Sequence, residues 1–582
     1  MAVTSGQPDV PGPLLEALRL GQRPIAFAAL FSLVSNLLYL ALPIYTNQVF
    51  SRVLSSQSAS TLWVLTGGAV FVFLISSVID NYRGQVLTGF SVVFDQQLAS
   101  RTFAALFDAV VRRQPVGRAQ ALRDLDTVRQ NIGGQAIGVF FDLPWMPLFL
   151  ILLFVIDPWI GLTTLVGGVI LLTLAILQDR ATRQEMKEAN DAALQSYAFT
   201  DSALRNAEVV RALGMLPALG RQWTHFRHTA VSGGAIASDK AASYANAIRF
   251  VRMVIQIAIV AVGAYLVIER SIPSGMLFAN MILASRALAP LERIVGSWNG
   301  LFAAKQAYDR LETLLAGYNP PPPTTQLPDP AGRITAENVS FAPAGALALV
   351  LVGLNFTIEP GDVVGVVGPS GAGKSSLMRL IVGIWKPNNG VIRIDGADVH
   401  AWDRTDFGRH VAYQPQDTEL FGGTVRDNIC RMRADADDAD VVAAAQAAGA
   451  HELILRLPKG YDTVLGESGV TLSSGQRQRV GLARTLFGQP KVVVLDEPNA
   501  NLDHEGEKAL TVAIAHLKAR GATVLIVSHK QSAFLHATKL MVLNEGKMTH
   551  FGPRDAVINA LKPQQPAQPA QPQRPSIAEA KP

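Results

Sequence analysis

A glycine-rich stretch followed by a lysine and two serines has the composition of a phosphate-binding loop. The stretch is Gly365-Val-Val-Gly368-Pro-Ser370-Gly371-Ala-Gly373-Lys374-Ser375-Ser376. It follows an apolar run typical of a β-strand and precedes Leu377–Val382, whose apolar residues have helical periodicity. Small residues let consecutive backbone N–H groups surround phosphate oxygens at a helix N-terminus, where the helix dipole favours anions. Lys374 would reach the β- and γ-phosphates, and the Ser375 hydroxyl would bind Mg²⁺. Taken alone, the motif predicts a phosphate site that GTPases and small-molecule kinases also carry.

Two adjacent carboxylates, Asp496 and Glu497, follow a second apolar run, Val492–Leu495. Such a run indicates a central parallel strand that delivers its last residues to the sheet edge where ligands bind. Asp496 is expected to hold Mg²⁺, directly or through water, and Glu497 to polarise an attacking water. The alternative is that Glu497 is a surface carboxylate without a role. It is disfavoured because a charge beside a buried strand end is costly.

The composition indicates more than one domain and a membrane. The chain has 582 residues, of which 17% are charged, and its mean hydropathy is +0.24; about 25% charge is usual in soluble proteins. The net charge of +5 is small, and basic runs with aromatics are absent, which argues against nucleic-acid binding. Cys430 is the single cysteine, so we expect an inert thiol rather than a disulfide or metal site.

Several apolar segments in the first half have the length of membrane-spanning helices, which need about 20 residues. A buried soluble core is the alternative, and three uncharged segments in the same half make it negligible. The segment Ile137–Ile156 can span a membrane only if Asp142, Pro144 and Pro147 lie near one of its ends. The segment Ile272–Pro290 is interrupted by Asn280 and Arg286. The first continues to full spanning length, so a cleavable signal is not expected. The six segments are Ile25–Ile44, Leu62–Ile79, Ile137–Ile156, Trp159–Leu177, Met253–Ile268 and Ile272–Pro290.

Arginine and lysine concentrate in the two long connections, after the second and the fourth segments. The positive-inside rule places these connections and both termini in the cytoplasm. Their turning points, near Leu122–Asn131 and Leu204–Leu213, are predicted to be short helices that dock on the nucleotide-binding part. Arg249 and Arg252 precede the fifth segment. The favoured interpretation is that these two arginines are positive charges on the cytoplasmic side of the span. The alternative is that they line a water-filled transport path and suit acidic cargo.

Between the two nucleotide elements lies Leu472-Ser473-Ser474-Gly475-Gln476-Arg477-Gln478-Arg479, opening a predicted helix through Val480–Leu486. This stretch resembles the signature sequence of ABC ATPases, with Ser474 where glycine is more usual. Other elements match the same family in the right order. Gln416 resembles the Q-loop glutamine of the family, and Gly466–Gly469 resembles the segment just before the signature. Asn501–Asp503 resembles the D-loop, and His529 resembles the switch histidine.

The resemblance implies an ATPase that works as a dimer. One subunit's loop covers one side of the γ-phosphate, and in the family the partner's signature covers the other side. Catalysis would then fall to Glu497, His529 and Gln416. The ATP ligands would be Gly368, Ser370, Gly371, Gly373, Lys374, Ser375, Ser376, Ser473, Gly475, Gln476 and Asp503, and the Mg²⁺ ligands Ser375, Gln416 and Asp496.

One position departs from the family pattern. The family usually has a tyrosine that stacks on adenine shortly before the phosphate-binding loop. Here the corresponding stretch is Val339-Ser-Phe341-Ala-Pro343, with Pro343 at the aromatic position. We therefore expect loose base selectivity, and we expect Phe341 to be a core residue rather than a substitute.

The membrane half resembles the permease/ATPase of bacterial type I secretion systems, in the branch that exports proteases and lipases with C-terminal signals. The likeness runs from about Leu20 to Gly552 and includes Phe141–Phe149, Gly275–Leu277, Arg286–Glu292 and Pro498–Asp503. It implies a homodimer in the bacterial inner membrane that exports unfolded polypeptides with a periplasmic membrane fusion protein and an outer-membrane channel. The first span begins too early to leave room for a peptidase domain. A lipid or small-molecule exporter and a non-transporting nucleotide-gated scaffold are the alternatives.

The expected fold class is multidomain: an all-α transmembrane domain with six helices, followed by an α/β P-loop NTPase domain. The proline run after Tyr318 predicts a stiff linker, and the Pro/Gln/Ala-rich C-terminus predicts a disordered tail. The expected boundaries are 1–24 for an N-terminal cytoplasmic segment, 25–315 for the transmembrane domain, 316–332 for the linker, 333–562 for the nucleotide-binding domain and 563–582 for the tail.

Overall fold

The computed structural model divides the chain into two compact units, Met1–Asn319 and Pro320–Pro582. It describes residues 12–112, 120–318, 320, 327–343, 345–346, 348–466 and 469–561. Residues 319 and 321–326 of the predicted linker, the tail from Gln564, and Glu467 with Ser468 lie outside the described residues. Each unit is described by itself.

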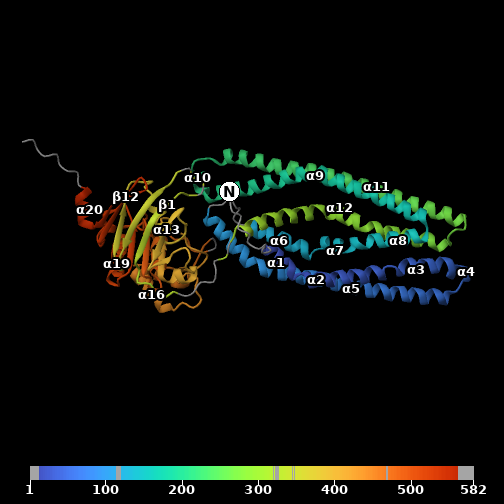
Figure 1. Ribbon diagram of the computed structural model, residues 1–582, viewed down its shortest axis with the longest axis horizontal. Helices are drawn as coiled ribbons and strands as arrows, with labels where there is room; N and C mark the ends of the chain where they lie inside the picture. The colour runs from blue at the N-terminus through green and yellow to red at the C-terminus, as the bar shows by residue number, and fades with distance from the viewer. Residues whose placement is uncertain are drawn as a thin grey trace, which may run out of the picture. The chain divides into compact units, whose positions relative to one another are not determined.

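The first unit is entirely helical in its described part, and six of its helical stretches are long and apolar enough to cross a membrane. The six predicted segments fall on these stretches, so the predicted all-α membrane domain is confirmed. Figure 1 shows α9 lying along α11 and α2 along α5. The helices are α1 (Pro13–Leu20), α2 (Gln22–Leu38), α3 (Ala41–Gln48), η1 (Val49–Val53), α4 (Leu54–Ser56), α5 (Ala59–Val111), α6 (Gln120–Gly133), α7 (Gln135–Asp142), η2 (Leu143–Trp145), α8 (Met146–Ile156), α9 (Pro158–Arg205), α10 (Ala207–Ala212), α11 (Leu216–Ile268) and α12 (Ser274–Ala316).

Apolar side chains cover the outside of these helices. Trp63 and Val64 of α5 are 73% and 75% exposed, and Val155 of α8 and Ile268 of α11 are also largely exposed. A water-soluble protein would bury such residues, whereas hydrocarbon solvates them. The exposed apolar exterior therefore fits a lipid-facing surface.

The third span is interrupted between α7 and α8. Pro144 lies in the turn η2, and Pro147 lies in the first turn of α8. Proline lacks a backbone N–H and disfavours helical geometry in the residue before it, so two prolines this close break the helix locally. The break leaves Asp142 as the last residue of α7.

The residues near Leu122–Asn131 lie in a helix, as predicted, but this helix, α6, is the start of the third span-length stretch rather than a turning point. The helix α6 packs along α5 and α12. Its apolar face contributes Leu125 and Val128 to a core. Arg310 donates two hydrogen bonds to the buried Asp124 of α6, Nε to Oδ2 at 2.8 Å and Nη2 to Oδ1 at 2.7 Å. The sequence showed the apolar periodicity of α6 without showing what it packs against.

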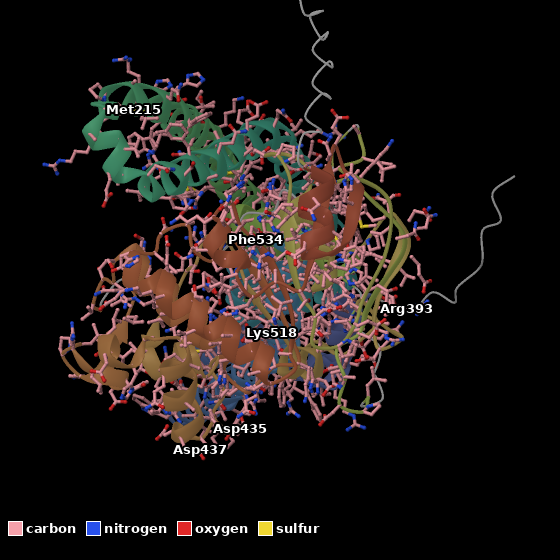
Figure 2. The ribbon with its side chains drawn as sticks, turned by 90° about the vertical axis from the view of Figure 1, so that its left-hand side faces the viewer. Met215, Arg393, Asp435, Asp437, Lys518 and Phe534 are labelled. Carbon is pink, nitrogen blue, oxygen red and sulfur yellow. The ribbon has the colours of Figure 1, made fainter. Side chains whose placement is uncertain are left out.

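The second predicted turning point, Leu204–Leu213, does contain a short helix, α10. Figure 2 shows Met215 at the end of this hairpin, where α10 leads into α11.

The second unit contains a mixed six-stranded sheet in the order β12-β11-β3-β10-β9-β6, in which only β12 is antiparallel to its neighbour. A separate four-stranded antiparallel sheet has the order β2-β1-β4-β5. The strands are β1 (Ile334–Phe341), β2 (Leu351–Ile358), β3 (Val363–Val367), β4 (Asn389–Ile394), β5 (Ala397–Asp398), β6 (Val411–Gln414), β7 (Gly423–Thr424), β8 (Val464–Leu465), β9 (Val492–Asp496), β10 (Thr523–Val527), β11 (Lys539–Asn544) and β12 (Lys547–Pro553).

The parallel strands explain the position of the nucleotide motifs. β9 and β10 are buried along their whole length, as their continuous apolar sequences predict. Because β3, β6, β9 and β10 run in the same direction, their carboxyl ends meet at one edge of the sheet. The predicted α/β domain is confirmed.

Helices connect and cover these strands: α13 (Lys374–Ile381), α14 (Arg404–His410), α15 (Val425–Ile429), α16 (Asp438–Ala447), α17 (His451–Leu455), η3 (Gly460–Asp462), α18 (Ser474–Leu486), α19 (His504–Ala519), η4 (Gln531–Phe534) and α20 (Arg554–Leu561).

One expectation about a single residue is met in this unit, the core position of Phe341. Cys430 is fully buried. Phe341 is buried in the core, where its ring stacks on Trp385 with 5.1 Å between the centroids.

Candidate functional site

The phosphate-binding loop joins β3 to α13, as the sequence predicts. The backbone φ angle is +80° at Gly371 and +93° at Gly373, a region that favours glycine. Lys374 is buried, and its Nζ donates hydrogen bonds to the carbonyl oxygens of Gly368 and Pro369, both at 2.9 Å. The loop therefore curls around the lysine at a helix N-terminus, an arrangement that binds phosphate. Ser370 and Ser376 lie in the same loop and in the first turn of α13.

We expect the addition of a methyl group to have unequal effects at Gly371 and Gly373. A Cβ at Gly373 would lie 2.5 Å from Leu351 Cδ2 and 3.1 Å from Val350 O, whereas a Cβ at Gly371 would meet nothing within 4 Å. Both positions have a left-handed backbone, which costs an alanine about 1–2 kcal/mol. We expect Gly373→Ala to weaken ATP binding at least about tenfold more than Gly371→Ala. Titration with a fluorescent ATP analogue measures this, and equal affinities would contradict it.

Ser375 and Asp496 meet where the loop faces the end of β9. The Ser375 hydroxyl donates to Asp496 Oδ1 at 3.0 Å, and Asp496 Oδ2 is buried without a hydrogen-bond partner among the described residues. Burial raises the pKa of Asp496, and the Ser375 hydrogen bond opposes part of that rise. A hydroxyl beside a carboxylate oxygen that lacks a partner is a donor set that Mg²⁺ fits.

Glu497 occupies an unusual backbone position directly after β9. Its φ is +50°, and its N–H donates to Val527 O at 2.9 Å. Its side chain lies between two predicted partners: Gln416 Nε2 donates to Oε2 at 3.0 Å, and His529 Nε2 lies 3.4 Å from Oε1. The structure therefore brings all three predicted catalytic residues together. Non-glycine residues in left-handed conformations cluster at functional sites, where the surrounding structure holds them in place.

Gln478 is a residue of this site whose role the sequence did not reveal. It is buried in α18, and its Nε2 donates to Pro498 O at 2.6 Å while its Oε1 accepts from Asn501 N at 3.2 Å. It therefore fixes the loop that follows Glu497. Its place within the signature-like stretch gave no hint of this, because the contact depends on how α18 lies against that loop.

We expect Gln478→Ala to lower ATP turnover about tenfold, because it leaves Pro498 O and Asn501 N without these partners and frees the loop that carries Glu497. ATP affinity should change much less, since Gln478 acts through that loop. Measuring turnover and nucleotide affinity side by side tests this. A loss of affinity as large as the loss of turnover would contradict the positioning role.

The signature-like residues form a separate group at the N-terminus of α18. Ser473 caps the helix in a capping box, accepting from Gln476 N at 3.3 Å while Gln476 Oε1 accepts from Ser473 N at 2.9 Å. A Cβ at Gly475 would lie 3.0 Å from Asn501 O. Asp503 caps α19 by accepting from Gly506 N at 2.8 Å, and Arg479 lies 3.6 Å from it.

Within the described residues, no hydrogen bond or ion pair joins this group to Lys374, Ser375 or Asp496. One chain therefore holds the phosphate-binding loop and the signature residues as two separate parts of a site.

A nucleotide-phosphate loop, a strand-end carboxylate pair and six span-length helices in one chain define a nucleotide-driven membrane transporter. The family model for the ABC transporter transmembrane region matches residues 25–290, and the ABC transporter model matches residues 351–500. The Type I secretion system ATP-binding protein PrsD of Rhizobium meliloti is 41% identical over 97% of both chains. The Cyclolysin secretion/processing ATP-binding protein CyaB of Bordetella pertussis is 30% identical over 91% of this chain and 75% of its own.

A solved bacterial Atm1-family ABC exporter with ATP bound has the same fold, with a TM-score of 0.79 and 22% identity over 93% of this chain and 97% of its own. The chain belongs to the ABC transporters, in the family of type I secretion ATP-binding proteins. It is a multi-pass membrane protein that binds nucleotide, couples ATP hydrolysis to transport, and works with partner proteins and a substrate. The resemblance noted from the sequence is confirmed.

Proposed function

We propose that the protein exports unfolded polypeptides with C-terminal secretion signals across the bacterial inner membrane, as the ATPase of a type I secretion system. The observation that carries the proposal is the 41% identity, over almost the whole of both chains, to a type I secretion ATP-binding protein. Its partners would be a second copy of the chain, a periplasmic membrane fusion protein and an outer-membrane channel. The basic long connections support a cytoplasmic position of the nucleotide-binding unit.

We assign hydrolysis to Glu497 as the base that polarises water, with Gln416 and His529 orienting its carboxylate. The phosphates would lie in the loop from Gly368 to Ser376, next to Lys374. Ser375 and Asp496, with Gln416, would hold Mg²⁺, which neutralises charge on the phosphates when it is bound.

Dimerisation completes this site. Phosphoryl transfer requires charge stabilisation on all sides of the γ-phosphate. Because no hydrogen bond or ion pair joins the signature group to the loop of its own chain in the part that the structure describes, the partner chain would supply Ser473, Gly475, Gln476 and Asp503. ATP would thereby hold two nucleotide-binding units together, and hydrolysis would release them.

The helix α10 and its neighbours would transmit this cycle to the membrane unit. Val209, Leu213 and Leu216 at this end of the α9–α11 hairpin are 51%, 71% and 70% exposed. Apolar side chains clustered at the end of a polar hairpin support docking on another surface, here the nucleotide-binding unit.

Secretion in cells tests the proposed function. The chain would be expressed with candidate fusion and channel proteins, and the proteins in the medium would be compared with those of a Glu497→Gln strain. We expect specific proteins to disappear from the medium of the variant strain at equal expression. Identical media, together with ATPase stimulation by lipids or drugs, would instead favour a lipid or small-molecule exporter.

A further inference from the structure

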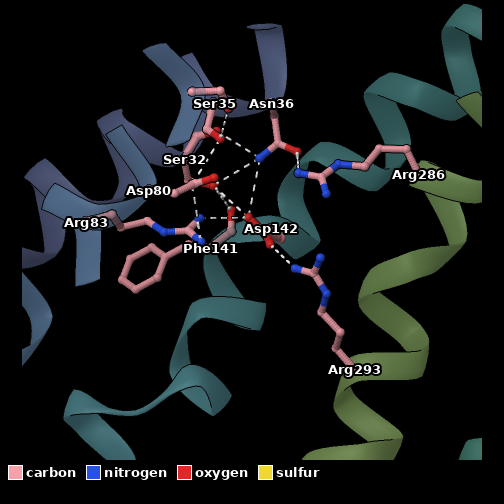
Figure 3. A network of polar contacts seen from close by, with 10 residues as sticks. Ser32, Ser35, Asn36, Asp80, Arg83, Phe141, Asp142, Arg286 and Arg293 are labelled. Atoms are coloured by element: carbon pink, nitrogen blue, oxygen red, sulfur yellow. Dashed lines mark hydrogen bonds and ion pairs between the residues drawn. The ribbon is translucent and has the colours of Figure 1, made fainter. Parts of the chain in front are cut away.

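A buried aspartate on one span of the membrane unit bonds residues of three other spans. Asp142 of α7 accepts at Oδ1 from Ser32 Oγ and Arg83 Nη1, both at 3.1 Å, and from Asn36 Nδ2 at 3.4 Å. Its other oxygen, Oδ2, accepts from Arg293 Nη1 at 2.8 Å. Figure 3 shows these side chains converging on Asp142 from α2, α5 and α12.

Asp142 and Arg286 lie inside their predicted spans, and Asp80, Arg83 and Arg293 lie just beyond the ends of theirs. At 1.5 Å per residue, Asp142 is about 21 Å from the end of its span at Ile156, and Arg286 is about 18 Å from the start of α12. Both distances are shorter than the roughly 30 Å of a hydrocarbon core. Ionisable groups at such depth are rare, face the bundle interior or a water-filled cavity, and mark substrate pathways.

A cavity of about 810 Å³ opens beside the cluster. Asp80, Arg83, Asp142 and Arg293 line it. Its volume falls in the range of sites that bind ligands. Several glycines also line it, and a Cβ added at Gly84 would meet nothing within 4 Å. The cavity therefore has room for a polypeptide segment to approach the backbone closely.

The charges of the cluster do not balance. Two aspartates, Asp80 and Asp142, face three arginines, Arg83, Arg286 and Arg293. The side chain of Arg83 is 18% exposed, whereas that of Arg293 is 49% exposed. Within the described part of the chain, Arg293 has no carboxylate within 4.0 Å other than Asp142, and a guanidinium carries five N–H donors. In the described part of the chain Arg286 forms no ion pair within 4.0 Å and donates to Asn36, so the surplus charge falls on Arg286. The free N–H donors at the cavity are those of Arg293.

We propose that this cavity binds acidic side chains of the exported polypeptide, with Arg293 donating to their carboxylates. The proposal rests on the proposed function and names a binding site for its substrate. Guanidinium–carboxylate pairs are strong and directional, and they are less screened here than in water. Leu87 and Val139 are the large apolar residues in the described lining, too few to hold a lipid acyl chain. The lining therefore favours a polypeptide over an anionic lipid.

Binding of defined peptides to the purified full chain in phosphatidylcholine nanodiscs tests the proposal. One fluorescent, unstructured probe peptide consists of Gly, Ser and Asp, and its counterpart has Asn at every Asp. We expect the Asp peptide to bind about tenfold more tightly than the Asn peptide. Arg293→Gln should abolish that difference, and Arg293→Lys should keep part of it.

A matched pair of glycines on α5 controls for general damage. Gly84 lines the cavity and Gly89 does not, and at either position a Cβ would meet nothing within 4 Å. Gly84→Leu should fill the cavity and weaken binding of the Asp peptide, whereas Gly89→Leu should leave it as in the wild type.

Two outcomes would overturn the proposal. One is equal binding of the Asp and Asn peptides to the wild type. The other is displacement of the Asp peptide when phosphatidylglycerol is added to the nanodiscs, which would assign the cavity to a lipid headgroup. Failure of the proposed function would appear separately, as secretion in cells that does not depend on Glu497.

Discussion

Replacing Glu497 by Gln lowers ATP turnover by about a thousandfold, the effect expected from removing a general base. The amide keeps the size of the side chain and can still bond Gln416 and His529, but it cannot accept a proton from water. Asp496 and the phosphate-binding loop are unchanged, so ATP binding is retained. Phosphate release from the reconstituted protein and binding of a fluorescent ATP analogue measure the two quantities.

Glu505→Gln is the matched control for this substitution. Glu505 is also a carboxylate of the nucleotide-binding unit, but its side chain is 85% exposed and its nearest positive partner, Arg479, is 3.9 Å away. Its loss should leave turnover within about twofold of the wild type, as for a surface ion pair. Residual turnover above a tenth of the wild-type rate in Glu497→Gln would assign the proton transfer to another group.

The three residues around the base should behave as one unit. Gln416 and His529 both contact the Glu497 carboxylate, at 3.0 Å and 3.4 Å. Groups that act together give strongly non-additive losses. Adding His529→Ala to Glu497→Gln should therefore reduce turnover little further, although His529→Ala alone reduces it clearly. Multiplying losses would indicate that His529 acts independently of Glu497.

The site was largely predictable because its chemistry depends on local spacing along the chain. The loop around Lys374 and the strand ending at Asp496 are short continuous motifs, and each needs only a strand and a turn to place it. The direction of the Glu497 side chain was harder to predict from the sequence. Its φ of +50° and its contacts depend on the ends of three separate strands. Gln478 was missed for the same reason, since its partners lie in another loop.

In the membrane unit, the spans could be predicted from the sequence, but the contacts of their polar residues could not. Hydropathy identifies the spans because every apolar segment of sufficient length faces the same solvent. It cannot identify what each polar residue meets, and so Asp142 was expected only to lie near the end of a segment. The packing of α6 could not be predicted for the same reason, since Leu125, Val128 and the Asp124–Arg310 pair hold this helix against partners distant in the sequence.

The Asp142 cluster gives the largest expected effect on stability. Asp142→Asn removes the charge that compensates Arg83 and Arg293, and breaking a buried pair from one side costs about 3–5 kcal/mol. We expect a loss near the lower end, about 3 kcal/mol, because the Arg293 side chain is half exposed. Unfolding of the membrane unit in mixed micelles with increasing denaturing detergent measures the change. Asp126→Asn is the control, because its pair with Arg129 lies at the surface and is worth less than about 1 kcal/mol.

A double-variant cycle separates the charge pair from general disruption. In Arg83→Gln the aspartate keeps Ser32, Asn36 and Arg293 as partners, and in Asp142→Asn the arginine keeps Asp80 at 3.6 Å. The combined variant removes both charges, so it should lose less stability than the two single losses added together, by about 1–3 kcal/mol. Additive losses would mean that Asp142 and Arg83 stabilise the bundle independently. In that case the polar atoms of Ser32 and Asn36, rather than the ion pair, hold α7 against α2.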